Sequence, residues 1–374
     1  MLDKRKVKSV LVIKMRNIGD VLLTAPVFAN LREYYPDARI CALVNSGTEA
    51  MLTDNPLIDH VHVYQRTIKS APLITRLANE LKLLKKLRAE HFDLVINLTE
   101  GDRGAVVALL SGAGYKVGVK SYGRGFRGKD RVFNRVVPYP AEGTHTVEQN
   151  LELLEAAGVP VTGKMVSFHF REQALAEVDR MLADAGIRPG GYFHAHFTSR
   201  WMFKCMPPAA AALLIDTLAD RSGLPAVLTA APVDKELAYL QLVKQACRTS
   251  PVDLSGALTL KEMGALTSRA SFFAGVDSAP MHMAAALDVP VLAVFGPSSV
   301  TTWGPWDNRL DANPYRNSRG IQSTGRHLVL QSERACVPCH RDGCNGSKKS
   351  DCLDFNAEEI DHVTTTFIQM LQNE

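Results

Sequence analysis

The stretch VLVIKMRNIGDVLLTAPVFANLRE, residues 10–33, decides the fold class of this chain. Its beginning is rich in Val, Leu and Ile, which predicts a strand over residues 7–14. Gly19 then permits a tight turn, and apolar residues recur at helical spacing over residues 20–35. A strand that passes through a short loop into a helix is typical of βαβ units.

The same alternation continues along the chain. Before residue 160, strands are expected over residues 39–44, 61–64, 92–98, 115–119 and 132–136, and helices over 73–88 and 146–157. After it, helices are expected over residues 173–185, 207–222, 234–247, 259–269 and 279–287, and strands over 192–197, 226–229, 271–276 and 289–295. Two successive series predict two doubly wound parallel sheets in separate domains.

The length of 374 residues supports this division, because single cores usually split beyond about 250–300 residues. We place the domains at residues 1–162 and 163–355, followed by a terminal helix over 356–374. Ligands bind beyond the carboxyl ends of the strands in such sheets. With two facing sheets, we expect the site in the cleft between them.

Composition excludes several classes of protein. Hydrophobic residues make up 46% and charged residues 22%, which argues against disorder. The net charge of +4 is small and no aromatic stacking motif accompanies the basic residues, so nucleic acid is not an expected partner. The longest apolar runs, such as residues 289–295, are far shorter than the roughly 18 residues that cross a bilayer. The basic N-terminus lacks a signal-peptide cleavage site, so we expect a cytoplasmic protein.

Basic residues gather in two segments of the N-terminal half. One group is Arg66, Lys69 and Arg76, and the other, interleaved with glycine, is Lys116, Lys120, Arg124, Arg127, Lys129, Arg131 and Arg135. Such groups form either a solvated surface or an anion-binding face. The second group lacks the acidic partners of a salt-bridged helix, which favours an anion-binding face.

The loop after the first expected strand is MRNIGD, residues 15–20. It has one glycine and no Gly-Lys-Ser ending, and its carboxylate would repel phosphate, so it is not a phosphate loop. Asp20 opens the expected helix, where aspartate commonly caps the first turn. The carboxylate could instead take the proton from an attacking hydroxyl, with the helix dipole favouring its ionised form. Position alone favours the capping role.

Three loops in the second half carry further polar residues. In HFTSRWMFK, residues 196–204, hydroxyls followed by cations suit a diphosphate, although ordinary polar loops have a similar composition. In GVDSAPMH, residues 275–282, Ser278 is a good N-cap and the helix start would hold a phosphate, so Asp277 is expected to meet sugar or ribose hydroxyls. His282 could be a buried, satisfied histidine. The FGPSS loop and the following WGPW, residues 295–306, are expected to form the floor or rim of the same pocket.

These segments together resemble glycosyltransferase family 9, the ADP-heptose:lipopolysaccharide heptosyltransferases. The resemblance is carried by IGDVLLTAPVFANLRE, the HFTSR loop with Lys204, VDSAPMHMAAALDVPVLAVFGPSS and TTWGPW, and it covers most of the chain. The Cys-rich ending most resembles the heptosyltransferase III subgroup, which adds the branching third heptose of the inner core.

The resemblance implies a GT-B fold with an N-terminal acceptor-binding domain and a C-terminal nucleotide-sugar-binding domain. It implies an inverting transfer of heptose from ADP-L-glycero-D-manno-heptose to heptose II of the lipopolysaccharide inner core (lipid A–Kdo–heptose), with no required cofactor. It also implies peripheral contact with the cytoplasmic face of the inner membrane.

The family's catalytic base falls on Asp20, which changes the favoured interpretation of that residue from cap to base. Its phosphate-binding lysine falls on Lys204. The donor-binding set implied by the family is Thr198, Ser199, Arg200, Lys204, Asp277, Ser278, Ala279 and His282, where many members have Gly in place of Ala279. An Ala-Ala-Pro sequence replaces the commoner Gly-Gly-Pro at residues 230–232, and Asp234 and Leu258 are expected to line the adenosine side.

The acceptor carries phosphates and acidic sugars, so basic residues of the N-terminal domain are expected to bind it. These are Arg66, Lys69, Arg76, Arg103, Arg124 and Arg127. Arg103 lies just past the strand expected over residues 92–98, and topology predicts that it faces the cleft.

Four of the seven cysteines, Cys336, Cys339, Cys344 and Cys352, form a C-x2-C-x4-C-x7-C cluster. The first pair has zinc-ligand spacing, which makes a structural zinc or iron–sulfur site one hypothesis. The later spacings fit no standard zinc template, and the family chemistry needs no metal. We therefore predict no metal in the sugar-transfer site. The clustered cysteines are expected to be free thiols or an adventitious disulfide in a small surface segment, dispensable for transfer. Cys41, Cys205 and Cys247 are expected to be isolated buried thiols.

Two alternatives stay open on the same fold. A nucleotide-sugar epimerase would need acid–base groups on the donor sugar but no basic acceptor face. A non-catalytic nucleotide-sugar or anionic-lipid binding protein could keep Lys204 and Ser278 without needing Asp20.

Overall fold

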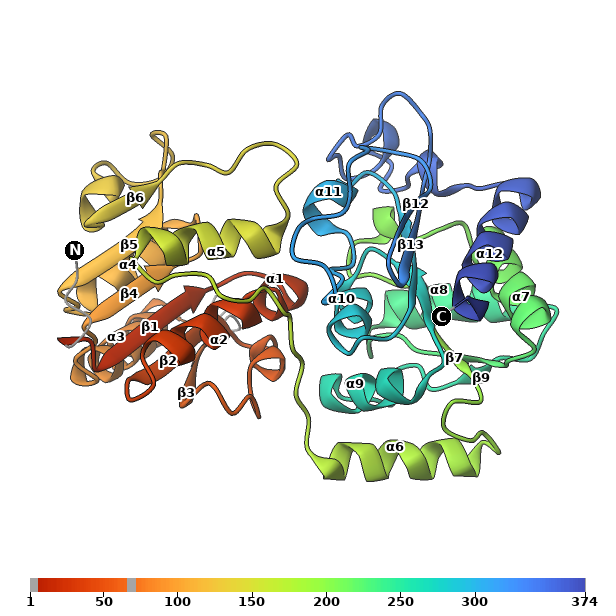
Figure 1. Ribbon diagram of the computed structural model, residues 1–374, viewed down its shortest axis with the longest axis horizontal. Helices are drawn as coiled ribbons and strands as arrows, with labels where there is room; N and C mark the ends of the chain where they lie inside the picture. Colours follow the sequence, from red (N-terminus) through yellow and green to blue (C-terminus); the bar gives the residue numbers. More distant parts are fainter. Residues whose placement is uncertain (1–5, 66–71, 374) are drawn as a thin grey trace. The chain divides into compact units, whose positions relative to one another are not determined.

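The computed structural model describes residues 6–65 and 72–373, which divide into two compact α/β units (Figure 1). The first unit is Met1–His169 and the second is Phe170–Glu374, so the terminal helix is part of the second unit. Each unit is built around one sheet whose strands lie mostly parallel. The cleft expected between the two sheets stays a prediction.

The sheet of the first unit has six parallel strands in the order β3-β2-β1-β4-β5-β6. The strands are β1 (Ser9–Lys14), β2 (Arg39–Asn45), β3 (His60–Tyr64), β4 (Leu94–Asn97), β5 (Tyr115–Val119) and β6 (Arg135–Val137). The chain moves outward from β1 to β3 and then returns to the other side of β1. The order therefore reverses between β1 and β4, the position at which Rossmann-type sheets bind ligands.

Helices cover both faces of this sheet. They are α1 (Ile18–Leu22), α2 (Ala25–Tyr34), α3 (Leu73–Ala89), α4 (Asp102–Leu110) and α5 (Thr146–Ala156). Leu11 and Val95 of the central strands pack in one core with Leu87 of α3 and Ala105 of α4. Alternate residues of a strand point to opposite faces, and α2 and α5 pack side by side against the sheet on the other face.

Two expectations for the first unit are wrong. The helix expected over residues 20–35 is two helices, α1 and α2, because Pro26 lacks the N–H that a continuous helix would bond and Thr24 instead bonds its hydroxyl to the Val21 carbonyl at 2.6 Å. Gly19 lies inside α1, so it is not a turn residue. Helix α4 was not anticipated, because its GAVVALL run has no clear helical period.

The sheet of the second unit has seven strands in the order β12-β13-β11-β10-β7-β8-β9. They are β7 (Phe193–His196), β8 (Ala226–Leu228), β9 (Val252–Asp253), β10 (Phe273–Val276), β11 (Val291–Phe295), β12 (Gln322–Thr324) and β13 (His327–Gln331). Only the pair β12–β13 is antiparallel among these strands of the described chain. The strand order reverses between β7 and β10, which is the expected ligand position in this sheet. The hairpin β12–β13 and the two-residue strand β9 were not anticipated.

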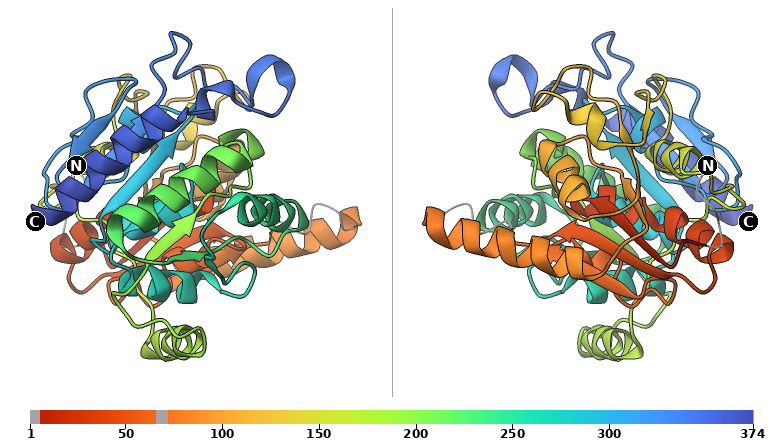
Figure 2. Two further views of the ribbon diagram at one scale, coloured as in Figure 1. Left: turned by 90° about the vertical axis from the view of Figure 1, so that its right-hand side faces the viewer. Right: turned by 90° about the vertical axis from the view of Figure 1, so that its left-hand side faces the viewer.

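Helices cover both faces of this sheet as well. They are α6 (Glu172–Asp184), α7 (Pro208–Ser222), α8 (Asp234–Ala246), α9 (Leu260–Arg269), α10 (Ala279–Ala286), α11 (Val300–Trp303) and α12 (Ala357–Gln372). One face buries α7, α8 and α12, and α12 lies alongside α7 (Figures 1 and 2). The other face buries α6, α9 and α10. Within residues 6–65 and 72–373, no helix combines the length and apolar character needed to span a bilayer.

Candidate active site

The loop after β1 places Asp20 at the strand-order reversal of the first unit. Helix α1 begins at Ile18 with Asn17 at its N-cap, so Asp20 is the third helical residue and does not open the helix. One carboxylate oxygen, Oδ2, accepts hydrogen bonds of 3.3 Å from both the backbone N–H and the side-chain amide of Asn17. The other oxygen, Oδ1, lies 3.4 Å from Arg16 Nε. Asp20 is only 7% exposed and its contacts are long, so the carboxylate is positioned but not tightly bound.

Neighbouring strands hold this loop in place. Thr99, two residues after β4, accepts a 2.8 Å hydrogen bond from the Met15 N–H. Asn45, the last residue of β2, donates a 3.0 Å bond to the Arg16 carbonyl. The backbone before Asp20 is therefore fixed from both sides of β1.

Lys14, the last residue of β1, is a buried cation whose position in an apolar strand gave no sign of a functional role. Its Nζ donates a 2.9 Å hydrogen bond to Asn150 Oδ1 of α5, and the Asn150 amide donates to the Leu23 carbonyl at 3.0 Å. Burial lowers the pKa of Lys14 to about 8, although the negative charge of Asp20 acts in the opposite direction. The base candidate therefore has a buried lysine as an electrostatic neighbour.

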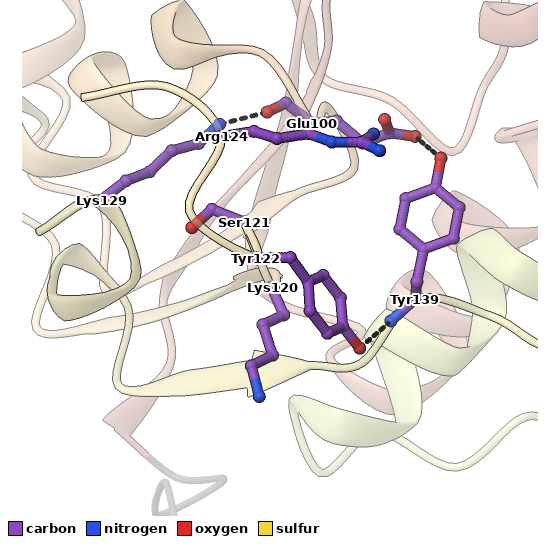
Figure 3. Close-up of a pocket in the computed structure, with 7 residues that line it drawn as sticks. All are labelled: Glu100, Lys120, Ser121, Tyr122, Arg124, Lys129 and Tyr139. Atoms are coloured by element: carbon purple, nitrogen blue, oxygen red, sulfur yellow. Dashed lines mark hydrogen bonds between the residues drawn. The ribbon is translucent and has the colours of Figure 1, made fainter. Parts of the chain in front are cut away.

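A pocket of about 230 Å³ lies in the first unit at the carboxyl ends of β4, β5 and β6 (Figure 3). Its lining consists of Glu100, Lys120, Ser121, Tyr122, Arg124, Lys129 and Tyr139. The Tyr139 hydroxyl donates a 2.8 Å hydrogen bond to Glu100 Oε1, and the Tyr139 N–H donates to the Tyr122 hydroxyl at 3.3 Å. The pocket therefore combines three cationic side chains with two aromatic rings and one carboxylate.

The predicted acceptor residues are spread over different environments. Arg124 lines the pocket, whereas Arg127 is exposed and does not line it. Arg103, on α4, lies over the Tyr64 ring at 4.3 Å and 3.7 Å from Glu80 Oε1. Arg66 and Lys69 lie outside the described residues, as does the side chain of Arg76.

Lys129 corrects the interpretation of the second basic group. This group was expected to lack acidic partners, but Lys129 is buried, lies 3.2 Å from Asp102 Oδ1 and donates to the Glu100 carbonyl. Its charge is already balanced inside the unit. The exposed members of the group therefore supply the surface charge.

In the second unit, two predicted donor residues meet at the reversal between β7 and β10. Lys204 ends a 3₁₀ turn (Met202–Lys204) in the loop after β7, and its Nζ lies 2.5 Å from Oδ2 of Asp277, the residue after β10. Burial raises the pKa of Asp277, but Lys204 and the hydroxyl of Ser298 outweigh that effect and leave the pKa below 3.8. Asp277 is therefore a buried carboxylate anion that fixes the lysine.

Ser278 is the N-cap residue of α10, but its hydroxyl makes no capping hydrogen bond. The Ser278 Oγ is buried and has no hydrogen-bond partner among the residues that the structure describes, which leaves a polar atom at the start of a helix unsatisfied. The predicted donor residues Ala279 and His282 follow within α10, where Ala279 is the first residue and His282 is buried. A helix start with a spare hydroxyl suits a phosphate oxygen.

Thr198 and Ser199 are buried, and Thr198 belongs to a network that was not anticipated. His196 lies 2.8 Å from the Thr229 hydroxyl through Nδ1 and 3.3 Å from the Thr198 hydroxyl through Nε2. His194 bonds the same Thr229 hydroxyl at 2.7 Å. Burial lowers the pKa of His196 to about 4 and that of His194 well below 6.5, so both rings are neutral.

The remaining predicted donor residues lie at the edges of these loops. Arg200 is exposed, and its guanidinium lies 5.5 Å from the centre of the Trp201 ring. Asp234 is exposed at the first position of α8, and Leu258 is partly buried against the core that contains Tyr192. The adenosine-side assignment of Asp234 and Leu258 stays a prediction.

Two Rossmann-like units, each with a polar loop at its strand-order reversal, form the GT-B fold that solved heptosyltransferase structures share. The chain belongs to glycosyltransferase family 9 (heptosyltransferase), whose family model matches residues 80–323. The chain is therefore a sugar-transferring enzyme.

Individual relatives agree with this assignment. The chain is 35% identical over 297 residues to lipopolysaccharide heptosyltransferase 3 of Escherichia coli, a match that covers 79% of this chain and 86% of the relative. Among solved structures, a family 9 glycosyltransferase from Veillonella parvula has a TM-score of 0.80 at 20% identity and covers 100% of this chain and 99% of its own. The E. coli heptosyltransferase WaaC, solved with ADP, has a TM-score of 0.71 at 19% identity and covers 97% of this chain and 99% of its own.

Proposed function

We propose that this chain transfers heptose from ADP-L-glycero-D-manno-heptose to the lipopolysaccharide inner core, as the branching third heptose on heptose II. The observation that carries the proposal is the 35% identity to lipopolysaccharide heptosyltransferase 3, which spans most of both chains. The arrangement of polar groups at the two strand-order reversals supports the same chemistry.

The second unit is proposed to bind the donor. Lys204 supplies a positive charge held by Asp277, and the start of α10 supplies backbone amides beside the unpartnered hydroxyl of Ser278. These groups are suited to the two phosphates of ADP, whose negative charge grows as the bond to the sugar breaks. Preorganised charge of this kind stabilises the leaving group.

The first unit is proposed to supply the base. The acceptor hydroxyl attacks the anomeric carbon of heptose from the side opposite to ADP, the proton passes to the Asp20 carboxylate, and the carbon–oxygen bond to ADP breaks. This single displacement from the face opposite the leaving group inverts the configuration at the anomeric carbon. Asp20 suits this role because it is preorganised by long bonds from Asn17 and does not form a tight ion pair.

The acceptor is proposed to bind the first unit near the pocket lined by Arg124. Phosphates and acidic sugars of the inner core would pair with its cations, and the sugar rings with Tyr122 and Tyr139. The exposed arginines beside it, such as Arg127, would also favour approach to the anionic cytoplasmic leaflet of the inner membrane. The proposed reaction uses no cofactor.

Acceptor-dependent release of ADP tests this function. Full-length protein with ADP-heptose should release ADP only when truncated lipopolysaccharide is present. A UDP-sugar used in place of ADP-heptose should release little UDP with the same acceptor. Conversion of the donor sugar without acceptor would instead support the epimerase. Donor binding without any turnover on any acceptor would support the binding protein.

A further inference from the structure

A chain of hydrogen bonds runs through the interior of the second unit and ends at the donor loop, the residues 197–204 that follow β7. The chain links Thr267 of α9, His194 and His196 of β7, Thr229 directly after β8, and Thr198 at the start of the loop. None of these five residues is more than 4% exposed. Water therefore has little access to their polar atoms, which must be satisfied by one another.

The direction of the hydrogen bonds follows from the end of the chain at α9. The Thr267 hydroxyl lies 2.8 Å from the Met263 carbonyl, and it must donate there because a carbonyl can only accept. Thr267 therefore accepts from His194 Nδ1, 2.9 Å away, so this nitrogen carries the ring proton. Burial keeps the His194 ring neutral by lowering its pKa well below 6.5, so the other nitrogen, Nε2, is an acceptor.

The same reasoning extends the direction to the donor loop. The Thr229 hydroxyl donates to His194 Nε2 at 2.7 Å, so it must accept from His196 Nδ1 at 2.8 Å. Since the buried His196 ring is also neutral, its Nε2 has no proton and accepts a 3.3 Å bond from the Thr198 hydroxyl. The hydroxyl hydrogen of Thr198 is therefore directed into the core.

We propose that this chain is a positioning relay, in which Thr229 and His196 hold the Thr198 hydroxyl as an anchor of the donor loop and keep it away from the bound diphosphate. The inference rests on the proposed donor site in the second unit. It gives Thr198 a different role from the donor contact that the family resemblance implies.

The neighbouring Ser199 shows the contrast within the loop. Its Oγ accepts a 3.2 Å hydrogen bond from the Trp201 N–H, so its hydroxyl hydrogen stays available for a phosphate oxygen. Thr198 has no exposed surface and its hydrogen is already committed to His196. Contact with the diphosphate then falls to Ser199 and Lys204. The relay fixes the start of the loop and Asp277 fixes Lys204 at its end, so the cation is ordered before the donor binds.

The tautomers of the two histidines test the relay directly and need no ligand. In full-length protein labelled with nitrogen-15 histidine at neutral pH, long-range proton–nitrogen correlation spectra distinguish Nδ1–H from Nε2–H. The single variants His194→Gln and His196→Gln assign the signals. Both rings should carry their proton on Nδ1, whereas a proton on Nε2 of either ring would overturn the relay.

The same spectra with ADP bound test the role of Thr198. His196 Nε2 should stay an unprotonated acceptor with an unchanged nitrogen shift, because Thr198 keeps donating to it. A proton gained by His196 Nε2, or the loss of its hydrogen bond, would show that Thr198 has turned to the diphosphate and would overturn the proposal. A wild-type protein that does not bind ADP would instead refute the donor site, while the ligand-free spectrum still reports the tautomers.

Calorimetry with ADP measures what the relay contributes to binding. Thr229→Val removes the central hydroxyl and should weaken ADP binding by about tenfold, because His196 loses the partner that fixes its tautomer. Thr198→Val should have a similar effect, and the double variant should be no more than about twofold weaker than either, since both changes break one chain. Thr229→Ser restores the hydroxyl and should restore the affinity.

Thr364→Val is the matched control. Thr364 is a buried threonine of α12 in the same unit, and its hydroxyl donates to the Ile360 carbonyl at 2.8 Å, outside the relay. Its ADP affinity should stay within about twofold of wild type. Unchanged affinity in Thr229→Val, together with a loss in Thr198→Val, would show that Thr198 contacts the diphosphate directly and would contradict the relay. If Thr229→Val does not fold, the wild-type spectra with and without ADP decide the same question.

Discussion

Lys204 Nζ and Asp277 Oδ2 lie 2.5 Å apart and join the two loops at the strand-order reversal of the second unit. Asp277 is 4% exposed, so its carboxylate has little access to water and depends on the lysine for compensation. Asp277 directly precedes Ser278, the N-cap residue of α10, so the pair holds the Lys204 cation close to the start of that helix. A diphosphate bound there would share a lysine that is already ordered.

Lys204→Ala should weaken ADP binding and slow transfer together, because the lost charge acts on both the bound donor and the departing ADP. Loss of one charge-assisted hydrogen bond corresponds to about a 10- to 100-fold rise in the ADP dissociation constant. The buried Asp277 carboxylate, left unpaired, adds repulsion to the same effect. Isothermal titration calorimetry with ADP measures the change.

Lys235→Ala is the matched control, because this exposed lysine bonds the Arg200 carbonyl in the same neighbourhood but does not reach Asp277. Its ADP affinity should stay within about threefold of wild type. Equal losses in the two variants would show that general surface charge, and not the Lys204–Asp277 pair, binds the donor.

His196 should make the stability of the protein depend on pH. Burial holds its pKa at about 4 in the folded state against 6.5 for an ordinary histidine, so the unfolded chain binds more protons between these values. The free energy of unfolding should therefore fall as pH decreases from 6.5 to 4, by about 3 kcal/mol for this group. Thermal unfolding at a series of pH values gives the slope.

Burial also lowers the pKa values of His194 and His62, so these residues contribute to the same dependence of stability on pH. The contribution of His196 is therefore measured by comparing a His196 variant with the wild type. His196→Gln keeps a hydrogen-bonding side chain beside Thr229 but removes the titration. Its melting temperature should depend less steeply on pH than that of the wild type. An unchanged slope would show that His196 is accessible to protons in the folded state.

Arg124 and Arg127 form a matched pair for testing the acceptor pocket. Arg124→Ala should raise the acceptor KM by about tenfold, because a charge-assisted contact inside the pocket is lost, and should leave ADP affinity unchanged. Arg127→Ala should give a smaller rise that fades with added salt, since an exposed charge is screened. Equal effects of both variants, or a loss of ADP binding in either, would contradict the assignment of the pocket to the acceptor.

The architecture could largely be predicted from sequence, because strand and helix periods alternate clearly along both halves. The misses have physical causes. Pro26 divides a helix that apolar spacing alone joins, and α4 is apolar on too many sides to show a period. The short strand β9 and the hairpin β12–β13 depend on pairing with neighbours, which local spacing does not encode.

The sequence predicted those site residues that lie in loops after strand ends, but not the contacts between them. Asp20, Lys204 and Asp277 each follow a strand end, so topology places them at the ligand-binding edges. The Lys204–Asp277 pair and the buried Lys14 depend on side-chain directions that the sequence does not give. Glu100 and Tyr139 also follow strand ends, and that position was the signal that could have identified them as pocket residues.

Asp20→Asn should lower turnover by roughly 100-fold or more, because the amide cannot accept the proton from the attacking hydroxyl. The variant has nearly the same shape and keeps an oxygen for the bonds from Asn17, so folding and ADP affinity should be preserved. Steady-state kinetics measure the loss of turnover, and a thermal melt shows whether that loss comes from the missing base or from misfolding. Near-normal turnover in a well-folded variant would show that Asp20 only caps α1.

The proposed reaction adds the third heptose to heptose II of the inner core. Its most direct test is ADP release from ADP-heptose with lipopolysaccharides truncated at successive core positions, with the mass of each product determined. Acceptors that contain heptose II should gain one heptose, whereas acceptors that end before it should not react. Efficient transfer to an acceptor without heptose II, or no transfer to any acceptor in the series, would contradict the proposed acceptor.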